Sequence, residues 1–295
     1  MKFGYVALIG KPNVGKSTLM NIMVGQKVSI VSNKPQTTLR RIIGIAQSEN
    51  YQIAFVDTPG IHEPHTRLGR AMIDSAKGAV SGVNLIVYVV DGSHRPSEED
   101  KEIAKYLRSS AQTVPIIVCL NKMDRLAPEN VLERVDAYTK LVGSDTYMLT
   151  TATKGHNVDK LLALILERLP EGDPAYGPDD FTDQSSRFMS AELVREKILS
   201  ATRQEVPHAT AVMIEDWQDD DSGTLRISAS IIVEKASQRA ILIGKQGQFI
   251  KKIGTLARQE IEELFGRKVY LDLFVKVRSD WRMNPRMLHE LEYAD

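Results

Sequence analysis

Short apolar runs alternate with amphipathic stretches over the first 169 residues. The apolar runs lack charges, which is typical of strands buried on both faces, and lie at 5–9, 42–46, 52–56, 85–90, 114–120 and 147–150. Helices are predicted between them, beginning near residues 18, 68, 98, 128 and 158, from the spacing of apolar residues and from start signals. Strands that alternate with helices predict an α/β fold with a doubly wound, mostly parallel sheet. Ligand loops of such folds lie at the carboxyl ends of the strands.

A segment dense in Pro and Gly at 170–178 interrupts this pattern. It predicts a first domain at 1–169, a linker at 170–186 and a second domain at 187–295. The second domain begins with a predicted helix at 188–201, followed by two alternating strands at 209–217 and 224–234. A short and a long helix then flank a pair of glycines. We therefore expect a smaller α+β domain after the α/β domain.

The sequence GKPNVGKS at 10–17 lies between the first predicted strand and the first predicted helix. In this context it predicts a loop that wraps a polyphosphate, because glycines allow backbone amides and the helix N-terminus to face the phosphates. Lys16 is expected to reach the β- and γ-phosphates, and the Ser17 hydroxyl to bind Mg²⁺. The predicted nucleotide contacts of this loop come from Gly10, Asn13, Val14, Gly15, Lys16, Ser17 and Thr18.

Two later segments provide candidate partners for the phosphate loop. Asp57 follows a buried strand and begins the sequence DTPG, where a carboxylate is expected to hold Mg²⁺ and Gly60 to approach the γ-phosphate. A polar stretch at 28–41 predicts a long functional loop. The hydroxyl of Thr38 in this loop is expected to complete the set of Mg²⁺ ligands. The predicted metal ligands are thus Ser17, Thr38 and Asp57.

The sequence NKMD at 121–124 predicts the base that the site selects. Guanine presents two adjacent N–H donors that the Asp124 carboxylate accepts together, whereas adenine has no donor at either place. Lys122 is expected to lie along the base, and Asn121 to connect neighbouring loops. The nucleotides expected are therefore GTP and GDP.

The second domain contains the sequence IGKQGQFIKKIG at 243–254, with a glycine pair between two predicted helices. Glycines without Cβ atoms allow a nucleic-acid backbone to approach, as in the GxxG loop of KH domains. Residues 224–286 carry 13 Lys or Arg against 6 Asp or Glu, which favours RNA as the ligand. The helix that precedes the strands indicates the prokaryotic KH topology. The predicted RNA contacts are Ile243, Gly244, Lys245, Gln246, Gly247, Phe249, Lys251 and Lys252.

Composition narrows the cellular context. The formal net charge is zero, so a charged partner is expected to bind where charges of one sign are concentrated locally. The single cysteine, Cys119, excludes an intrachain disulfide and favours a reducing compartment. No apolar run is long enough for a transmembrane segment, and no leader is expected. We expect a cytoplasmic monomer, and peripheral membrane association is left open.

The ordered sequences GKPNVGKS, QTTLR, DTPG, NKMD and TAT resemble the five nucleotide-contacting motifs of translation-factor-class GTPases. The longer segments KPQTT and DTPGIHEPHTRLGRAM are similar to the corresponding segments of the bacterial Era family. This resemblance implies GTP hydrolysis with Mg²⁺, switch I at 34–40 and switch II at 57–69, with Thr151, Ala152 and Thr153 contacting the base. It also implies binding of 16S ribosomal RNA near its 3′ end and a role in maturation of the small ribosomal subunit.

Ile61 follows DTPG where Ras-like proteins have a glutamine that orients the attacking water. Intrinsic hydrolysis is therefore expected to be slow, with Lys16, Thr38, Gly60 and Asn13 as the catalytic residues. Asn13 either helps to hold a K⁺ ion beside the phosphates or only shapes the loop, and both interpretations stay open. His62 and His65 are interpreted as part of the switch rather than as metal ligands or bases.

Two alternative functions are also compatible with parts of the sequence. A P-loop metabolic kinase would phosphorylate a small molecule, but it would need neither Asp124 nor the glycine pair. A membrane-associated signalling switch would use the second domain for protein contacts.

Trp281, near the end of the chain, either stacks on RNA or packs on its own domain.

Overall fold

The structure is a computed structural model that describes residues 1–61, 64, 66–111 and 113–293. It divides into two compact units, which consist mainly of residues 1–183 and 184–293.

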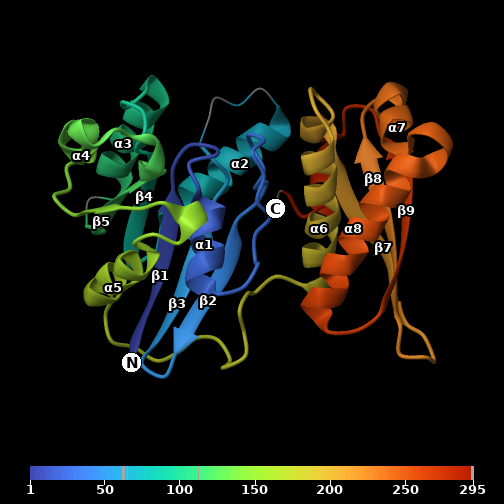
Figure 1. Ribbon diagram of the computed structural model, residues 1–295, viewed down its shortest axis with the longest axis horizontal. Coiled ribbons are helices and arrows are strands. Elements are labelled where there is room, and N and C mark those ends of the chain that lie inside the picture. The colour runs from blue at the N-terminus through green and yellow to red at the C-terminus, as the bar shows by residue number, and fades with distance from the viewer. Residues whose placement is uncertain (62–63, 65, 112, 294–295) are drawn as a thin grey trace. The chain divides into compact units, whose positions relative to one another are not determined.

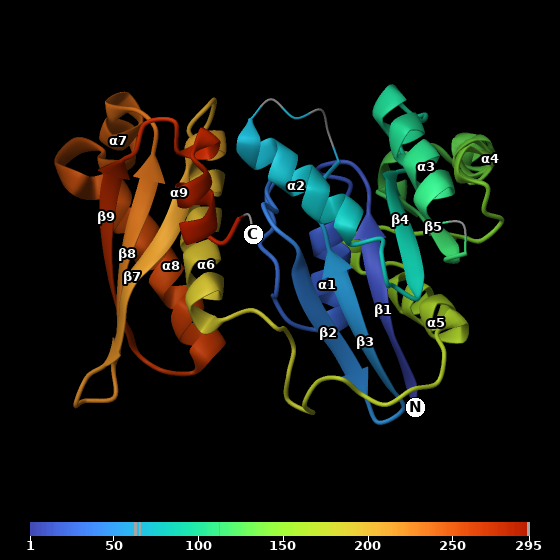
Figure 2. The ribbon, with the colours of Figure 1, turned by 180° about the vertical axis from the view of Figure 1, so that it is seen from behind.

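The first unit is a sheet with helices on both faces. Its strands are β1 (Lys2–Ile9), β2 (Ile42–Ser48), β3 (Tyr51–Asp57), β4 (Leu85–Asp91), β5 (Ile116–Asn121) and β6 (Tyr147–Leu149). Its helices are α1 (Lys16–Val24), α2 (Arg67–Gly78), α3 (Glu98–Ser110), α4 (Val131–Val142) and α5 (Val158–Arg168). Figure 1 shows α1 and α5 over one face of this sheet, and Figure 2 shows α2 and α3 over the other.

The strand order is β2-β3-β1-β4-β5-β6, with β2 antiparallel to β3 and the other pairs parallel. This confirms the predicted doubly wound, mostly parallel sheet. The apolar residues of β4 are fully buried because helices cover both faces of this central strand. Because β1, β3 and β5 are parallel to one another in the sheet, the loops that follow them meet at one edge.

The segment after α5 is hydrogen-bonded along the edge strand β2 and the start of β3. The Gln52 side-chain carbonyl accepts from the backbone amides of Ala175 and Tyr176 at 2.9 and 3.0 Å. The Ile45 amide donates to the Phe181 carbonyl at 2.9 Å, and the Thr182 hydroxyl donates to the Ile43 carbonyl at 2.6 Å. Much of the segment expected to be a linker is thus attached to the first unit.

The second unit contains α6 (Ser186–Ala201), β7 (Ala211–Asp219), β8 (Leu225–Val233), α7 (Ala236–Ile243), α8 (Gln248–Phe265), β9 (Val269–Val277) and α9 (Pro285–Glu290). The strand order is β7-β8-β9, with β7 antiparallel and β9 parallel to β8. This confirms the predicted α+β domain, whose first helix precedes the sheet.

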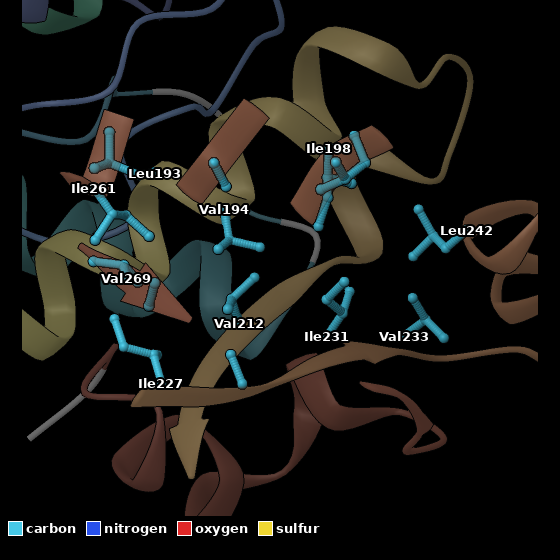
Figure 3. Packing of buried hydrophobic residues seen from close by; sticks show 14 of the residues in the cluster. Leu193, Val194, Ile198, Val212, Ile227, Ile231, Val233, Leu242, Ile261 and Val269 are labelled. Carbon is cyan, nitrogen blue, oxygen red and sulfur yellow. The ribbon is translucent and has the colours of Figure 1, made fainter. Parts of the chain in front are cut away.

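One apolar core joins the helices and the sheet of the second unit. Figure 3 shows side chains of α6, α7 and α8, among them Val194, Leu242 and Ile261, gathered with those of the strands. The inward positions of β8, including Ile227 and Ile231, are at most 1% exposed. Because this alternation leaves polar residues such as Arg226 on the other face, the strand pattern predicted from the sequence agrees with the burial.

Candidate functional sites

The phosphate loop joins β1 to α1 in the predicted strand–loop–helix context. Gly15 has φ +108°, and a Cβ atom there would lie 2.2 Å from the Asn121 Nδ2, so only glycine fits. Asn13 is exposed and has a left-handed φ of 61°, whereas Val14 is buried. The Lys16 ammonium donates to the carbonyls of Gly10 and Lys11 at 2.9 and 2.8 Å, which holds it over the loop.

The three predicted metal ligands converge at the start of α1. Ser17 Oγ donates to Asp57 Oδ2 at 2.6 Å and lies 3.1 Å from Thr38 Oγ1. Thr38 Oγ1 in turn lies 3.5 Å from the same carboxylate oxygen. The other oxygen, Asp57 Oδ1, is buried and has no hydrogen-bond partner among the described residues. Two hydroxyls and a carboxylate with an unused oxygen fit Mg²⁺, which prefers oxygen ligands.

Burial dominates the electrostatics of this cluster. It raises the pKa of the Asp57 carboxyl, while the Lys16 ammonium and the hydroxyls of Ser17, Ser29 and Thr38 oppose the rise. Burial also lowers the pKa of Lys16 to about 8, although the Asp57 charge opposes this. Each charged group therefore favours the charged form of the other. A bound metal ion would further favour the Asp57 carboxylate, and bound phosphates would further favour the Lys16 ammonium.

Ser29 and Asn21 belong to the same cluster and were not among the predicted site residues. Ser29 Oγ donates to Asp57 Oδ2 at 3.0 Å. The Asn21 side chain accepts from the Val28 and Ser29 amides and donates to the Ser29 carbonyl. One signal was present in the sequence, since Asn21 lies one helical turn after Ser17 and therefore on the same face of α1.

The predicted base-recognition loop follows β5. Asn121 Nδ2 donates to the Val14 carbonyl at 2.9 Å, and Asn121 Oδ1 accepts from Thr150 Oγ1 and the Ala152 amide. Asn121 thus connects the phosphate loop with the segment of Thr151, Ala152 and Thr153. Asp124 lies in this loop with its carboxylate 3.2 Å from the Lys154 ammonium.

Asp91, at the end of β4, is a further residue that the sequence did not indicate. Its carboxylate accepts from the Lys122 ammonium at 2.8 Å and from Ser93. Burial raises the pKa of Asp91, but the hydrogen bonds from Lys122 and Ser93 outweigh it and the pKa lies below its ordinary value. Asp91 therefore fixes the charged end of Lys122, whose stem is expected to lie along the base.

The segment after β3 approaches the phosphate loop closely. A Cβ atom on Gly60 would lie 2.4 Å from the Pro12 nitrogen, so a side chain cannot be accommodated there. Ile61 is half-buried, packs against the core that includes Ile9, and donates its amide to the Gly10 carbonyl at 3.4 Å. Its side chain has no polar atom with which to orient water. His62 and His65, interpreted from the sequence as switch residues, lie outside the described residues.

The glycine pair of the second unit lies between α7 and α8, as predicted. Gly244 and Gly247 have φ of +71° and +75°, and Gln246 between them also has a left-handed φ of 51°. The side chains of Lys245, Gln246, Lys251 and Lys252 are exposed, whereas Ile243 and Phe249 are half-buried. Phe249 also packs against the core, so only part of its ring is accessible.

A groove of about 270 Å³ lies between α8 and β9. Ile250, Lys251 and Gly254 form one wall, and Leu271 and Leu273 of β9 form the other. The wall contributed by β9 was not predicted, because that strand was not among the elements assigned from the sequence. Trp281 is buried and donates from Nε1 to the Ala209 carbonyl at 3.0 Å, which supports the packing interpretation over RNA stacking.

Comparisons with known proteins agree with both sites. Residues 5–122 match the sequence model of a family described as 50S ribosome-binding GTPase, and residues 205–282 match that of the KH domain. GTPase Era of Heliobacterium modesticaldum is 43% identical over 295 residues, which cover 100% of this chain and 98% of that protein. GTPase Era of Thermotoga petrophila is 49% identical over 284 residues, which cover 96% and 94% of the two chains.

Two solved structures resemble the whole chain. A crystal structure of Era in complex with MgGDPNP and nucleotides 1506–1542 of 16S ribosomal RNA has a TM-score of 0.95 at 42% identity and covers 100% of both chains. A variant of Aquifex aeolicus Era bound to GDP and AlF4⁻ has a TM-score of 0.94 at 40% identity, with the same coverage. Among the described residues, no helix is long and apolar enough to cross a membrane.

Proposed function

Because the chain belongs to the Era family of GTPases, we propose that it hydrolyses GTP and binds 16S ribosomal RNA near its 3′ end, and so assists maturation of the small ribosomal subunit. Nucleotide state acts as the switch. The protein works as a monomer in the cytoplasm, and its RNA contacts come from the KH domain.

The observation that carries this proposal is the convergence of Ser17, Thr38 and Asp57 beside the phosphate loop. Ser17, Thr38 and Asp57 would hold Mg²⁺, which when bound neutralises charge between the β- and γ-phosphates. Lys16 supplies a second positive charge from inside the loop, and Gly60 brings a backbone amide toward the γ-phosphate. Ile61 positions no water, so Asn13, with or without K⁺, or an external activator supplies the remaining catalysis.

Base selection belongs to the loop after β5. Asp124 accepts the two adjacent N–H donors of guanine, Lys122 lies along the ring, and the backbone amides near Ala152 contact the base. The remaining proposed nucleotide contacts are Gly10, Asn13, Val14, Gly15, Thr18, Asn121, Thr151 and Thr153.

RNA binding belongs to the glycine pair and the helix that follows it. The left-handed glycines Gly244 and Gly247 let the RNA backbone approach, and the exposed Lys245, Lys251 and Lys252 contact its phosphates. Ile243, Gln246 and Phe249 complete the proposed surface. We propose domain boundaries at 1–169 for the GTPase domain and 187–295 for the KH domain, with 170–186 between them.

Nucleotide binding provides a test of the first half of the proposal. GTP and GDP are expected to bind about 10⁴-fold more tightly than their adenine counterparts, because adenine leaves the Asp124 carboxylate without donors. Asp124→Asn should shift the preference toward xanthosine triphosphate, whose O2 accepts from the new amide. Equal affinity of the unaltered chain for ATP and GTP, measured with fluorescent analogues, would contradict the assignment.

Crosslinking in cells, followed by sequencing of the bound RNA, tests the second half. The reads are expected to concentrate near the 3′ end of 16S ribosomal RNA and to be lost when Gly244 and Gly247 are replaced by Asp. An even distribution over cellular RNA, or reads that persist in the double variant, would contradict the proposed role of the KH domain.

A further inference from the structure

The two oxygens of the Asp57 carboxylate have different surroundings. Oδ2 accepts from Ser17 and Ser29 at 2.6 and 3.0 Å and lies 3.5 Å from the Thr38 hydroxyl, whereas buried Oδ1 has no partner among the described residues. The carboxylate therefore has one oxygen held by the protein and one available to a metal ion or its bound water. This orientation lasts only while donors stay on Oδ2.

Ser17 and Thr38 have a second task in the proposed function. Both hydroxyls are proposed Mg²⁺ ligands, so their oxygen atoms must face the ion. Thr38 also belongs to the segment expected to act as switch I, at 34–40. Neither hydroxyl is thus a donor dedicated to holding Asp57 in one orientation.

Ser29 is placed differently. The residue is 1% exposed, and its hydroxyl donates to Asp57 Oδ2. Asn21 Oδ1 accepts from the amides of Val28 and Ser29, both at 2.9 Å, and Asn21 Nδ2 donates to the Ser29 carbonyl at 2.7 Å. Three hydrogen bonds, one from Val28 and two from Ser29, therefore attach this backbone to helix α1, ahead of the expected switch segment.

We infer that Ser29, held on α1 by Asn21, is a positioning residue that fixes the Asp57 carboxylate so that its free oxygen serves Mg²⁺. The inference rests on the proposed GTPase function. Partners that orient a ligating group contribute to metal affinity, and their loss typically weakens metal binding or activity 10- to 100-fold. A purely structural role for Ser29 would instead affect the stability of the fold and the binding of nucleotide with or without metal.

Release of a fluorescent GDP at a series of Mg²⁺ concentrations separates these two roles. For the unaltered chain, Mg²⁺ should slow release with a defined midpoint concentration. Ser29→Ala should raise this midpoint about tenfold, while the release rate in excess EDTA stays within about twofold of the unaltered chain. Ser144→Ala is the matched control, because it removes a hydroxyl that donates to the Ile116 carbonyl at 2.6 Å and accepts from the Thr146 amide at 3.3 Å, and neither partner is a site residue.

An unchanged midpoint in Ser29→Ala would overturn the inference, as would a release rate that rises equally with Mg²⁺ and with EDTA. Ser29→Cys, with a weaker donor of similar volume, should shift the midpoint in the same direction. It keeps the inference testable if the alanine variant fails to fold, since an unchanged midpoint in Ser29→Cys would overturn it. If Mg²⁺ did not slow release from the unaltered chain, the proposed function and this inference would fail together.

Discussion

Asn121 Nδ2 donates a 2.9 Å hydrogen bond to the backbone carbonyl of Val14, so the base-recognition loop is attached directly to the phosphate loop. The same amide group accepts from Thr150 Oγ1 and from the Ala152 backbone. Three loops that follow different elements therefore share one buried side chain, and the spacing between base site and phosphate site depends on it.

Asn121→Ala should destabilise the first domain, because it leaves buried polar groups on Val14 and Ala152 without partners. Each such group costs about 1–3 kcal/mol, so for the two groups together we expect the free energy of unfolding to fall by about 2–6 kcal/mol. Urea denaturation measures the change. Asn130→Ala is the control, since Asn130 makes no side-chain cap bond, and its effect should stay within about 0.5 kcal/mol. Equal effects of the two substitutions would contradict the role given to Asn121.

GDP binding should take up protons near pH 8. Burial lowers the pKa of Lys16 to about 8, so about half of the Lys16 side chains carry the ammonium form at that pH. Bound phosphates favour the ammonium and raise its pKa, so affinity should fall as the pH rises above 8. Calorimetry at pH 8 in two buffers of different ionisation enthalpy should give an uptake of about half a proton. At pH 7, where Lys16 is already charged, the uptake should be smaller; the same uptake at both pH values would rule out Lys16 as its source.

Replacing Gly244 and Gly247 by Asp should abolish RNA binding, while GTP hydrolysis without RNA persists. A Cβ at Gly244 would lie 2.6 Å from Phe249 Cβ, whereas a Cβ at Gly247 would meet no described atom within 4 Å beyond its chain neighbours. Gly247 therefore offers the sharper comparison, in which Gly247→Asp adds a charge and Gly247→Asn has the same size without it. Binding of single-stranded RNA should fall most for Asp.

Lys251→Ala and Lys252→Ala should weaken RNA binding less and flatten its salt dependence. Each lost phosphate contact is expected to lower the slope of log affinity against log salt by about 0.7. Full affinity in the double-glycine variant, measured by fluorescence anisotropy, would contradict the KH assignment.

Hydrolysis should be faster in KCl than in NaCl at equal ionic strength if Asn13 helps to hold a monovalent ion. Asn13 is exposed in the loop with a left-handed backbone, and K⁺ spans longer oxygen distances than Na⁺. The ion would neutralise charge that an arginine finger neutralises elsewhere. Asn13→Ala should remove the difference between the salts. Equal rates in both salts would point to RNA or the ribosome as the activator that compensates for Ile61.

The sequence predicted those parts of the site that depend on local context. Ser17 lies in the helix after β1 and Asp57 ends β3. Both strands are recognisable from their apolar runs, and parallel strands bring their ends together. Ser29 and Asp91 were missed because their partners, Asp57 and Lys122, are 28 and 31 residues away in the chain. No local pattern reports such a contact.

Two features of the fold were also not predicted. Strand β9 was not assigned from the sequence. Its first six residues alternate between buried or half-buried positions and exposed ones, but two of the exposed residues, Tyr270 and Phe274, are themselves apolar. The segment after α5 has the Pro and Gly content of a free linker, but its backbone groups bond to Gln52 and to β2. Composition reports how a segment bends and gives no information on which surface it covers.

The attachment of this segment has a consequence for self-association. An edge strand presents unpaired backbone groups that invite another chain to add to the sheet, and β2 occupies one edge of the first sheet. Phe181 and Thr182 occupy the Ile45 amide and the Ile43 carbonyl along that edge. The stretch up to Asp183 thus blocks intermolecular strand pairing along β2. A chain cut after Leu169 should expose this edge and become prone to aggregation, whereas a chain cut after Asp183 should keep the edge covered.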